Sequence, residues 1–250
     1  MPKTPDELDA MAASGAVLAE CHDLMAAELG VGVTTAHLDE VAEELIRSRG
    51  GVPAFKGYPG PTPFPASICA SVNDQVVHGI PGDAPLAEGD ILAIDCGVVL
   101  DGWVSDAART YAIGTVSPIA GRLIESTRAS LDRAIEACIL GNRVGDIGNA
   151  VQTEIEGAGF SVVQSLVGHG VGRSMHEEPQ VPNYGLPGTG TELVEGLVIA
   201  IEPMVNVGGH EVVLADDGWT ITTRDGSLSA HWEHTVAVTA DGPRILTLAA

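Results

Sequence analysis

Aromatic residues are scarce in this chain: only 4 % of its 250 residues are Phe, Trp or Tyr, although 45 % are hydrophobic. The core must therefore consist mainly of Val, Ile, Leu and Ala. Basic residues are also few, since 12 Lys and Arg stand against 34 Asp and Glu, for a formal net charge of −22. Proteins that bind phosphate backbones need clustered Lys and Arg, so we expect no direct nucleic acid binding. The acidity indicates a soluble, repelling surface, with a few carboxylates turned inward to hold cations.

Cysteines and long apolar runs are equally limited. The four cysteines (Cys21, Cys69, Cys96 and Cys138) are widely spaced and form no C-x-x-C pair, which favours reduced thiols in the cytosol over a disulfide framework. No apolar run approaches the roughly 20 residues of a membrane helix. Residues 1–7 also lack the basic and then apolar pattern of a signal peptide. We therefore expect a cytoplasmic protein that does not bind membranes.

Hydrophobic periodicity predicts helices and strands in one continuous domain. A first helix should begin at Pro5, with Thr4 as N-cap and Glu7 completing a capping box, and end at Gly30. Further helices are predicted over 35–50, 117–140 and 146–156. Strands are predicted over 67–78, 90–99, 103–112, 160–167, 197–205, 211–214, 220–223 and 234–239. The proline-rich segment 53–65 is expected to be an irregular loop and no linker, because strand-like sequence resumes directly after it.

Two ten-residue segments of the chain resemble each other without a gap. Residues 86–95 (LAEGDILAID) match residues 193–202 (LVEGLVIAIE), and a carboxylate closes each copy. A His-Gly pair precedes each copy, and a further acidic residue, expected on a strand, follows it. Either two strand-forming stretches are alike by chance, or the chain contains a duplicated unit whose halves face each other across a shared site.

A predicted hairpin brings two aspartates together. If Asp101-Gly102 forms the turn, Asp95 faces Ala108 in the partner strand, and Asp106 faces Gly97. Both carboxylates then lie on one face of the sheet as diagonal neighbours, with Cα atoms about 7–8 Å apart. Like charges on buried strands are unfavourable unless a cation lies between them. The alternative, one carboxylate in solvent at the sheet margin, conflicts with the two-residue period of a strand.

Other polar residues interrupt apolar sequence in a similar way. Glu202 follows the run Leu197–Ile201, which should be buried on both faces, and Glu233 directly precedes a Val-rich strand. His169 lies among glycines that leave room around its imidazole. Taken singly, such residues are more often salt-bridged than metal-bound, but their joint placement in two similar halves favours ligands. Further candidates are His78, His176, Glu177 and Glu178.

The candidate ligands are rich in oxygen. Four carboxylates and one imidazole, with no thiolate, suit Mn, Fe(II) or Co(II), and Zn less exclusively. Four carboxylates carry too much charge for a single divalent ion. Two ions about 3.5–4 Å apart and bridged by carboxylates would balance that charge and build a hydrolytic site. This set comprises Asp95, Asp106, His169, Glu202 and Glu233.

Five motifs together resemble those of the type I methionine aminopeptidases. They are residues 73–81 (NDQVVHGIP), the hairpin with its two aspartates, residues 168–179 (GHGVGRSMHEEP), residues 201–205 (IEPMV) and residues 233–235 (EHT). The likeness covers nearly the whole chain in order. It implies a single catalytic domain over residues 1–250 of the α+β class, with the pita-bread fold. In that fold two pseudo-symmetric halves form a central antiparallel curved sheet with outer helices. We expect a monomer.

The resemblance implies a metal ligand set and an activity. Asp95 should bind one divalent ion, His169 and Glu202 the other, and Asp106 and Glu233 both; Co, Mn, Fe(II) and Zn all suit these donors. The pair would activate a water for attack on the scissile carbonyl. The implied reaction removes the N-terminal methionine from peptides and nascent chains when the second residue is small.

The resemblance also implies roles for residues that are not ligands. His78 and His176 should contact the substrate and stabilise the tetrahedral intermediate, while Glu202 should also carry a proton. The methionine pocket should be apolar and tolerant of sulfur. Candidates for its lining are Tyr58, Phe64, Cys69, Met175 and Trp219.

Some positions depart from the family's pattern without removing a ligand. Pro61-Thr62-Pro63 is an apparent insertion at the pocket rim. Val77 replaces a frequent cysteine, Gly97 a frequent threonine, Ser105 a frequent glycine, and Met175 a usual aromatic residue. These changes concern the fit of the substrate rather than the reaction.

Two other functions are compatible with part of this pattern. Prolidases and Xaa-Pro aminopeptidases use a similar metal site but usually carry an additional N-terminal domain, for which the sequence before His78 leaves no room. A non-catalytic binding protein of the same fold should have lost ligands, whereas here all five are present.

Overall fold

The helices begin where local sequence signals predict them. In this computed structural model, which describes residues 2–249, α1 spans Pro5–Glu28. The Thr4 hydroxyl accepts a hydrogen bond from the Glu7 N–H, and the Glu7 carboxylate accepts one from the Thr4 N–H, so the predicted capping box is confirmed. The other helices are α2 (Thr35–Ser48), α3 (Pro118–Ala137) and α4 (Val144–Gly157). Each lies within a few residues of its predicted bounds.

Fifteen strands form within residues 2–249. In chain order they are β1 (Val52–Pro53), β2 (Ile68–Val72), β3 (Gln75–Val77), β4 (Ile91–Leu100), β5 (Trp103–Ala112), β6 (Ser161–Val162), β7 (Val167–Gly170), β8 (Glu177–Pro182), β9 (Val198–Ile201), β10 (Met204–Asn206), β11 (Val212–Leu214), β12 (Ile221–Thr223), β13 (Ser229–His231), β14 (His234–Thr239) and β15 (Gly242–Ile245). The sequence did not predict β1, β8, β13 or β15, and the strand predicted over 160–167 contains β6 but reaches only the first residue of β7. The four unpredicted strands are short or, in β8, contain prolines that weaken the strand pattern.

The hairpin of β4 and β5 has the predicted register. Asp101 and Gly102 both have positive φ, 51° and 75°, as a two-residue type I′ turn requires. Asp95 pairs with Ala108, and Gly97 pairs with Asp106. A turn of fixed geometry therefore determines which face both aspartates share.

In the second half of the fold, β9 pairs with β14 and β10 pairs with β13, and an interruption of two residues in each chain segment separates the two antiparallel pairings. Ile201 of β9 pairs with His234 of β14, and Met204 of β10 pairs with His231 of β13. The residues between them, Glu202-Pro203 and Trp232-Glu233, are therefore opposite each other and outside the ladder. The expectation that Glu233 lies on a strand is wrong, because the chain leaves the ladder opposite a proline that has no N–H to donate.

Threonine hydroxyls join the two halves. The Thr235 hydroxyl accepts a hydrogen bond from the Asp106 N–H at 3.0 Å and donates one to the Asp106 carbonyl at 2.8 Å. Thr110 makes the same pair of bonds with the backbone of His231, at 2.9 and 2.7 Å. Strand β5 of the first half therefore runs alongside β13 and β14 of the second, and their backbones are held in register.

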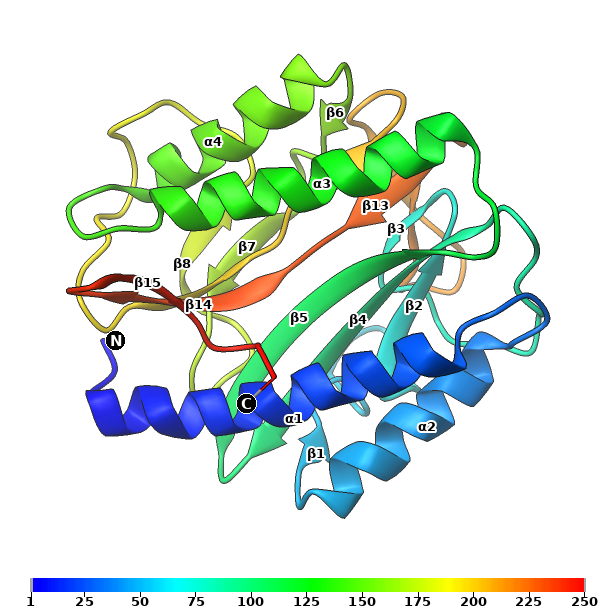
Figure 1. The fold of residues 1–250 in the computed structure, drawn as a ribbon, viewed down its shortest axis with the longest axis horizontal. Coiled ribbons are helices and arrows are strands. Elements are labelled where there is room, and N and C mark those ends of the chain that lie inside the picture. Colours follow the sequence, from blue (N-terminus) through cyan, green and yellow to red (C-terminus); the bar gives the residue numbers. More distant parts are fainter. Residues whose placement is uncertain (1, 250) are drawn as a thin grey trace.

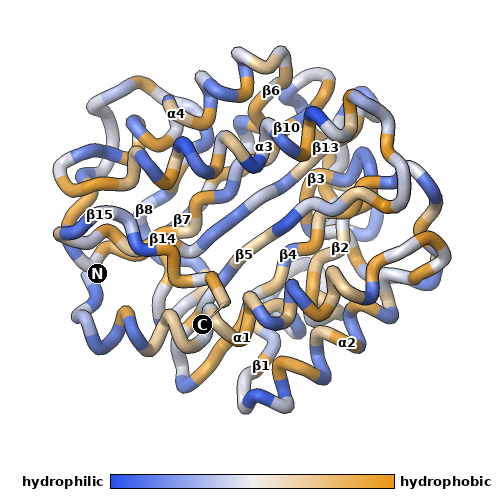
Figure 2. The backbone as a smooth tube through the Cα atoms, viewed as in Figure 1, coloured by the Kyte–Doolittle hydropathy of each residue, from blue (hydrophilic) through white to orange (hydrophobic). Residues whose placement is uncertain are grey.

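The four helices of residues 2–249 lie on one side of the strands (Figure 1). Helix α1 packs on β4 and β5, and α3 packs on α4 and β13. Hydrophilic and hydrophobic stretches alternate along each helix, as expected when one face of a helix covers a sheet (Figure 2). None of these helices is long and apolar enough to cross a bilayer.

Each half has its own hydrophobic core. Leu18, Leu38 and Ile94 are among the residues that pack under α1 and α2, while Leu123 and Ile199 belong to the cluster under α3 and α4. The two similar segments of sequence lead into β4 and β9, which are interior strands of their sheets. The architecture thus agrees with the duplicated halves that the sequence predicts.

Candidate metal centre

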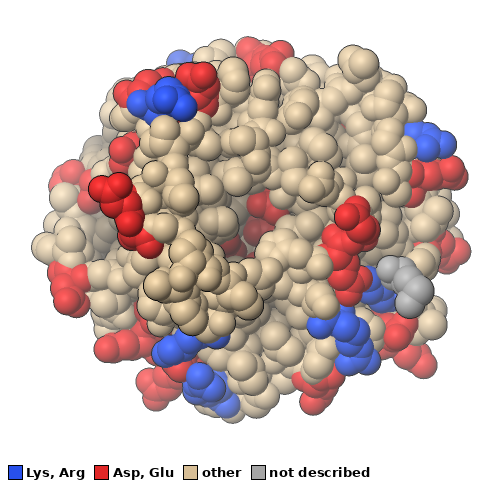
Figure 3. Space-filling model, turned by 180° about the vertical axis from the view of Figure 1, so that it is seen from behind, with Lys and Arg blue, Asp and Glu red and all other residues tan. Residues whose placement is uncertain are grey.

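A cavity opens on the side of the molecule opposite the helices, and acidic side chains form its floor (Figure 3). Twelve of the fourteen residues that the sequence singled out for the site line this cavity, and Glu177 and Glu178 do not. The twelve are Tyr58, Phe64, Cys69, His78, Asp95, Asp106, His169, Met175, His176, Glu202, Trp219 and Glu233. Val77, noted above as a departure from the family's pattern, also lines the cavity, and so do Phe55, Leu166, Met204 and His231, which the sequence did not single out. Residues from both halves of the fold are therefore brought together at one site.

The five candidate ligands lie in three parts of the fold. Asp95 and Asp106 lie on the β4–β5 hairpin, and His169 lies on β7. Glu202 and Glu233 lie at the double interruption described above. There the Glu233 N–H donates to the Ala108 carbonyl at 2.9 Å, which ties the interruption to the hairpin strand. Asn183 donates to the Glu202 carbonyl at 2.9 Å.

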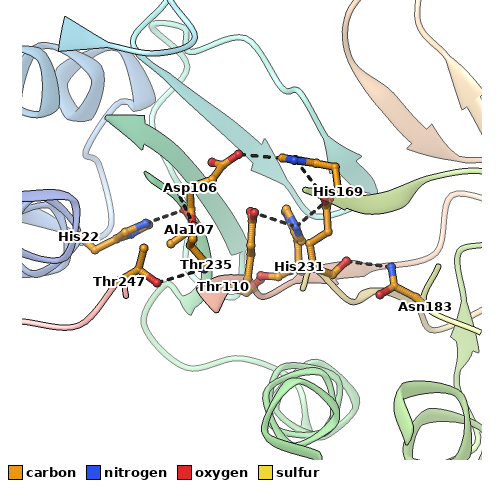
Figure 4. A network of polar contacts seen from close by, with 11 residues as sticks. His22, Asp106, Ala107, Thr110, His169, Asn183, His231, Thr235 and Thr247 are labelled. Carbon is orange, nitrogen blue, oxygen red and sulfur yellow. Dashed lines mark hydrogen bonds and ion pairs between the residues drawn. The ribbon is translucent and has the colours of Figure 1, made fainter. Parts of the chain in front are cut away.

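Three of these residues converge closely. Donor atoms of Asp106, His169 and Glu233 all lie within 4.8 Å of one another. His169 Nε2 lies 3.8 Å from Asp106 Oδ2 and 3.5 Å from Glu202 Oε1, and Figure 4 shows the imidazole pointing toward the Asp106 carboxylate. Its Nδ1 lies 3.0 Å from the Gly170 carbonyl. Because a carbonyl can only accept, Nδ1 carries the proton and the Nε2 lone pair faces the cavity.

Burial and mutual repulsion disfavour the charged forms of the acidic residues. Burial raises the pKa of Asp95 to about 7. The pKa values of Asp106, Glu202 and Glu233 are raised well above their usual range, first by burial and then by the other carboxylates of the cluster. The pKa of His169 is lowered to about 4, mainly by burial. The site thus holds a neutral imidazole among carboxyl groups that need a cation to ionise together.

Within residues 2–249, several buried polar atoms of the site have no hydrogen-bond partner, and such atoms are possible metal donors. Five buried side-chain atoms have no hydrogen-bond partner in the described part of the chain, and four of them belong to cavity residues. These four are Asp95 Oδ1, Asp106 Oδ1, Glu233 Oε1 and His231 Nε2. Buried polar atoms without partners are rare in proteins, and oxygen and imidazole nitrogen atoms are donors for divalent cations. The donor set therefore fits a metal centre.

His78 and His176 line the cavity beside this centre. His78 has a positive φ of 59°, which a non-glycine residue adopts at some energetic cost. The next residue holds this turn, since the Gly79 N–H donates to the Ser71 hydroxyl at 3.1 Å. The His176 ring lies 4.3 Å from that of His169 between centroids, and its Nδ1 lies 2.7 Å from the Tyr58 hydroxyl.

An apolar pocket adjoins the two histidines. The rings of Phe64 and Trp219 meet edge to face, with centroids 5.2 Å apart. Trp219 Nε1 donates to the Thr62 carbonyl at 3.0 Å, so the Pro61-Thr62-Pro63 segment holds this indole at the pocket rim. A Cβ at position 97 would lie 2.8 Å from Met175 Cε and 2.9 Å from both Ala54 Cβ and Phe55 Cε1, so only glycine leaves these side chains their space.

Glu177 stabilises a loop and is not a ligand of the site. Its Oε1 accepts hydrogen bonds from the backbone N–H groups of Arg173 at 2.9 Å and Ser174 at 3.3 Å. Its Oε2 accepts from the Lys3 ammonium at 2.7 Å. The carboxylate thus closes the loop that carries His176 and lies outside the cavity lining. Glu178 is exposed and likewise does not line the cavity.

His231 is the polar residue of the site that sequence reasoning missed. It is 2 % exposed, and its Nε2 lies 3.8 Å from Glu202 Oε2 and 3.9 Å from Glu233 Oε2. Burial lowers its pKa to about 3, so the ring is neutral. The only signal in the sequence is a histidine two positions before Glu233, and nothing local indicates which way its ring points.

The chain is similar to known peptidases over almost its full length. Residues 9–240 match metallopeptidase family M24. A methionine aminopeptidase of Clostridium perfringens is 51 % identical over 246 residues, which cover 98 % of each chain. The crystal structure of the methionine aminopeptidase from Rickettsia prowazekii matches with a TM-score of 0.96 and 43 % identity, over 99 % of each chain.

A prolidase from Pyrococcus horikoshii shares the fold only. Its TM-score is 0.78 at 20 % identity, and this chain, matched over its whole length, covers 64 % of it. The similarities confirm both the pita-bread fold of the α+β class and the resemblance inferred from the five motifs. The observed halves, the convergent acidic site and the family match lead to one conclusion: this chain belongs to metallopeptidase family M24.

Proposed function

We propose that this protein is a methionine aminopeptidase that removes the N-terminal methionine from peptides and nascent chains when the second residue is small. The observation that carries the proposal is the placement of an acidic metal-binding floor directly beside an apolar pocket in one cavity. The same name is borne by relatives about 50 % identical over nearly their whole length.

The residues that would hold two divalent ions, drawn from Co, Mn, Fe(II) and Zn, are Asp95, Asp106, His169, Glu202 and Glu233. Asp95 would contribute to one position, His169 and Glu202 to the other, and Asp106 and Glu233 to both. When bound, these ions supply Lewis-acid polarisation of the scissile carbonyl and a water of lowered pKa. The carboxyl groups with raised pKa lose their protons as the cations bind, because the charges then have partners.

The protein's own residues position the substrate and move protons. An ion held by these residues would also bind the free α-amine of the substrate, which would restrict cleavage to the first peptide bond. Glu202 takes a proton from the attacking water and delivers it to the leaving amine. His78 and His176 donate hydrogen bonds to the oxygen of the tetrahedral intermediate. The Tyr58 hydroxyl at His176 Nδ1 holds that ring in place.

The pocket selects methionine by shape and softness. Phe64, Cys69, Met175 and Trp219 present apolar and polarisable surfaces, which suit an unbranched thioether. His78 and Trp219, with ring centroids 6.5 Å apart, narrow the cavity next to the pocket. A bulky second residue of the substrate would meet this constriction, so small second residues are favoured.

Three further properties complete the proposal. The protein acts as one catalytic domain over residues 1–250, since both halves contribute donors to a single cavity. It works as a monomer, because one chain supplies the whole donor set. It acts in the cytoplasm, where its buried, unpaired cysteines remain reduced.

A comparison of two peptides tests the activity. Purified protein is assayed on Met-Ala-Ser and on Ala-Pro peptides, with and without a chelator. We expect release of methionine from the first peptide, loss of that release with chelator, and recovery when a divalent ion is restored. Preference for the Ala-Pro peptide would indicate a prolidase, and cleavage of neither would indicate a binding protein. Either result would refute the proposal.

A further inference from the structure

The buried imidazole of His231 is not explained by the five-residue ligand set. Its Nε2 is inaccessible to solvent and has no hydrogen-bond partner. It faces one oxygen of Glu202 at 3.8 Å and one of Glu233 at 3.9 Å. These distances exceed the roughly 2.7–3.2 Å of a hydrogen bond. Burying a polar atom without a partner is energetically unfavourable, so this position calls for a ligand that satisfies it.

The distances fit two donors that share one ion. Donor atoms lie about 2.0–2.2 Å from a divalent transition metal, so two donors of the same ion are separated by roughly 3–4 Å. His169 has the same relation to the cluster, with its Nε2 3.5 Å from Glu202 Oε1 and 3.8 Å from Asp106 Oδ2. Glu202 therefore lies between two imidazoles, and each of its oxygens faces one of them.

The backbone of His231 holds the ring in this position. Thr110 on β5 binds both the N–H and the carbonyl of His231, and β13 pairs with β10 through Met204. Figure 4 shows the His231 backbone joined to Thr110 in this way, close to His169. Because its backbone is fixed in this way, the His231 imidazole is pre-organised for metal binding, as expected of a ligand side chain.

We propose that His231 is a sixth protein donor of the metal centre and binds, through Nε2, the ion that Glu202 and Glu233 hold. This inference rests on the metal centre of the proposed function. It gives one of the two metal positions a pair of imidazoles, His169 and His231. A second nitrogen donor favours metals with high affinity for imidazole, such as Zn, Fe(II) and Co, over Mn, which prefers oxygen. Metal choice in this protein should therefore depend on His231.

X-ray absorption of the protein loaded with one equivalent of Zn²⁺ tests the proposal, because imidazole ligands produce a countable multiple-scattering signal. We expect two imidazoles in the wild type, and one in each of His231→Gln and His169→Gln. His37→Gln is the matched control, since this exposed imidazole on α2 is far from the cavity lining and should leave two. The wild-type count does not depend on how well any variant folds.

Metal affinities provide a second measurement. Competition with a chromophoric chelator should show that His231→Gln weakens Zn²⁺ binding by about 100-fold or more, at or above the upper end of the roughly 10–100-fold that loss of an outer contact produces. The same substitution should weaken Mn²⁺ binding by less than about 10-fold, so that the Zn/Mn preference falls. Melting of the metal-free proteins confirms that the variants are folded.

The outcomes separate this inference from the proposed function. One imidazole in the wild type, unchanged by His231→Gln, would overturn the role of His231 while leaving the five-residue centre intact. An equal loss of Zn²⁺ and Mn²⁺ affinity with two imidazoles retained would also overturn it, since His231 would then act only on the carboxylates. Failure of the wild type to bind any divalent ion would instead refute the metal centre itself.

Discussion

Replacement of Asp106 by Asn should stabilise the metal-free protein and destroy its response to metal. Asp106 is 4 % exposed, its Oδ1 has no partner, and Glu233 and Asp95 repel its charge. An asparagine of the same shape removes this charge and can donate to either neighbour. Relief of a buried, unsatisfied carboxylate corresponds to about 1–3 kcal/mol. For a chain of this size, that gain is a rise in melting temperature of roughly 3–10 °C.

The gain should depend on pH in one direction. Burial and neighbouring carboxylates raise the pKa of Asp106 above its unfolded value. The acid form is therefore favoured in the folded state, and the penalty of ionisation is absent below the unfolded pKa and grows as pH rises through the folded pKa. The variant should exceed the wild type clearly at about pH 8 and match it below about pH 4.

Added metal should reverse the order of the two proteins. A ligand at about 100 times its dissociation constant stabilises the wild type by about 2.7 kcal/mol. The variant lacks a carboxylate that binds both ions, so its gain should stay below about 1 kcal/mol. The Asp106→Asn variant should have no turnover and a lower metal content than the wild type.

Thermal unfolding of chelator-treated and Mn²⁺-titrated protein measures the changes in stability, while a peptide assay and elemental analysis measure turnover and metal content. Asp132→Asn, on the exposed face of α3, is the control and should leave both melting temperatures unchanged. Two results would refute the reasoning: a metal-free variant less stable than the wild type at about pH 8, or equal shifts of both proteins on adding metal.

Three other predictions concern the substrate. His78→Ala should lower kcat by about 100-fold or more with metal content near wild type, as measured by elemental analysis; loss of metal would instead make His78 a ligand. Peptides beginning Met-Ala should have kcat/KM at least about 100-fold above those beginning Met-Leu, and efficient cleavage of Met-Leu would contradict the narrow cavity. Gly97→Ala should raise KM for methionyl peptides more than it lowers kcat, because the new Cβ would lie 2.8 Å from Met175 Cε; an unchanged KM would show that Met175 yields freely.

Local signals predicted the part of the site that lies on the hairpin. Two turn residues with positive φ determine the register of β4 and β5. Asp95 and Asp106 are only eleven positions apart, so their common face follows from strand periodicity. The capping box at Thr4 is similarly local. In each case the residues that determine the structure are close together in the sequence, and little chain entropy opposes their contact.

The apposition of Glu202 and Glu233 depends on long-range pairing. Pro203 marks the end of β9, but only the pairing of β9 with β14 and of β10 with β13 shows that the second break lies opposite the first. His231 illustrates the same limit, because its ring direction depends on Thr110, which is 121 positions away. No periodicity connects residues at such separations.

The amino-acid sequence by itself determined the helix starts, the hairpin register, the oxygen-rich choice of donors and the membership of a peptidase family. It did so because turns, caps and strand alternation act over a few residues. Only the tertiary structure decided that twelve predicted residues share one cavity, that Thr62 supports Trp219, and that a second imidazole faces Glu202. Those relations arise where two separately packed halves meet, and their geometry follows from how both cores pack rather than from any single segment.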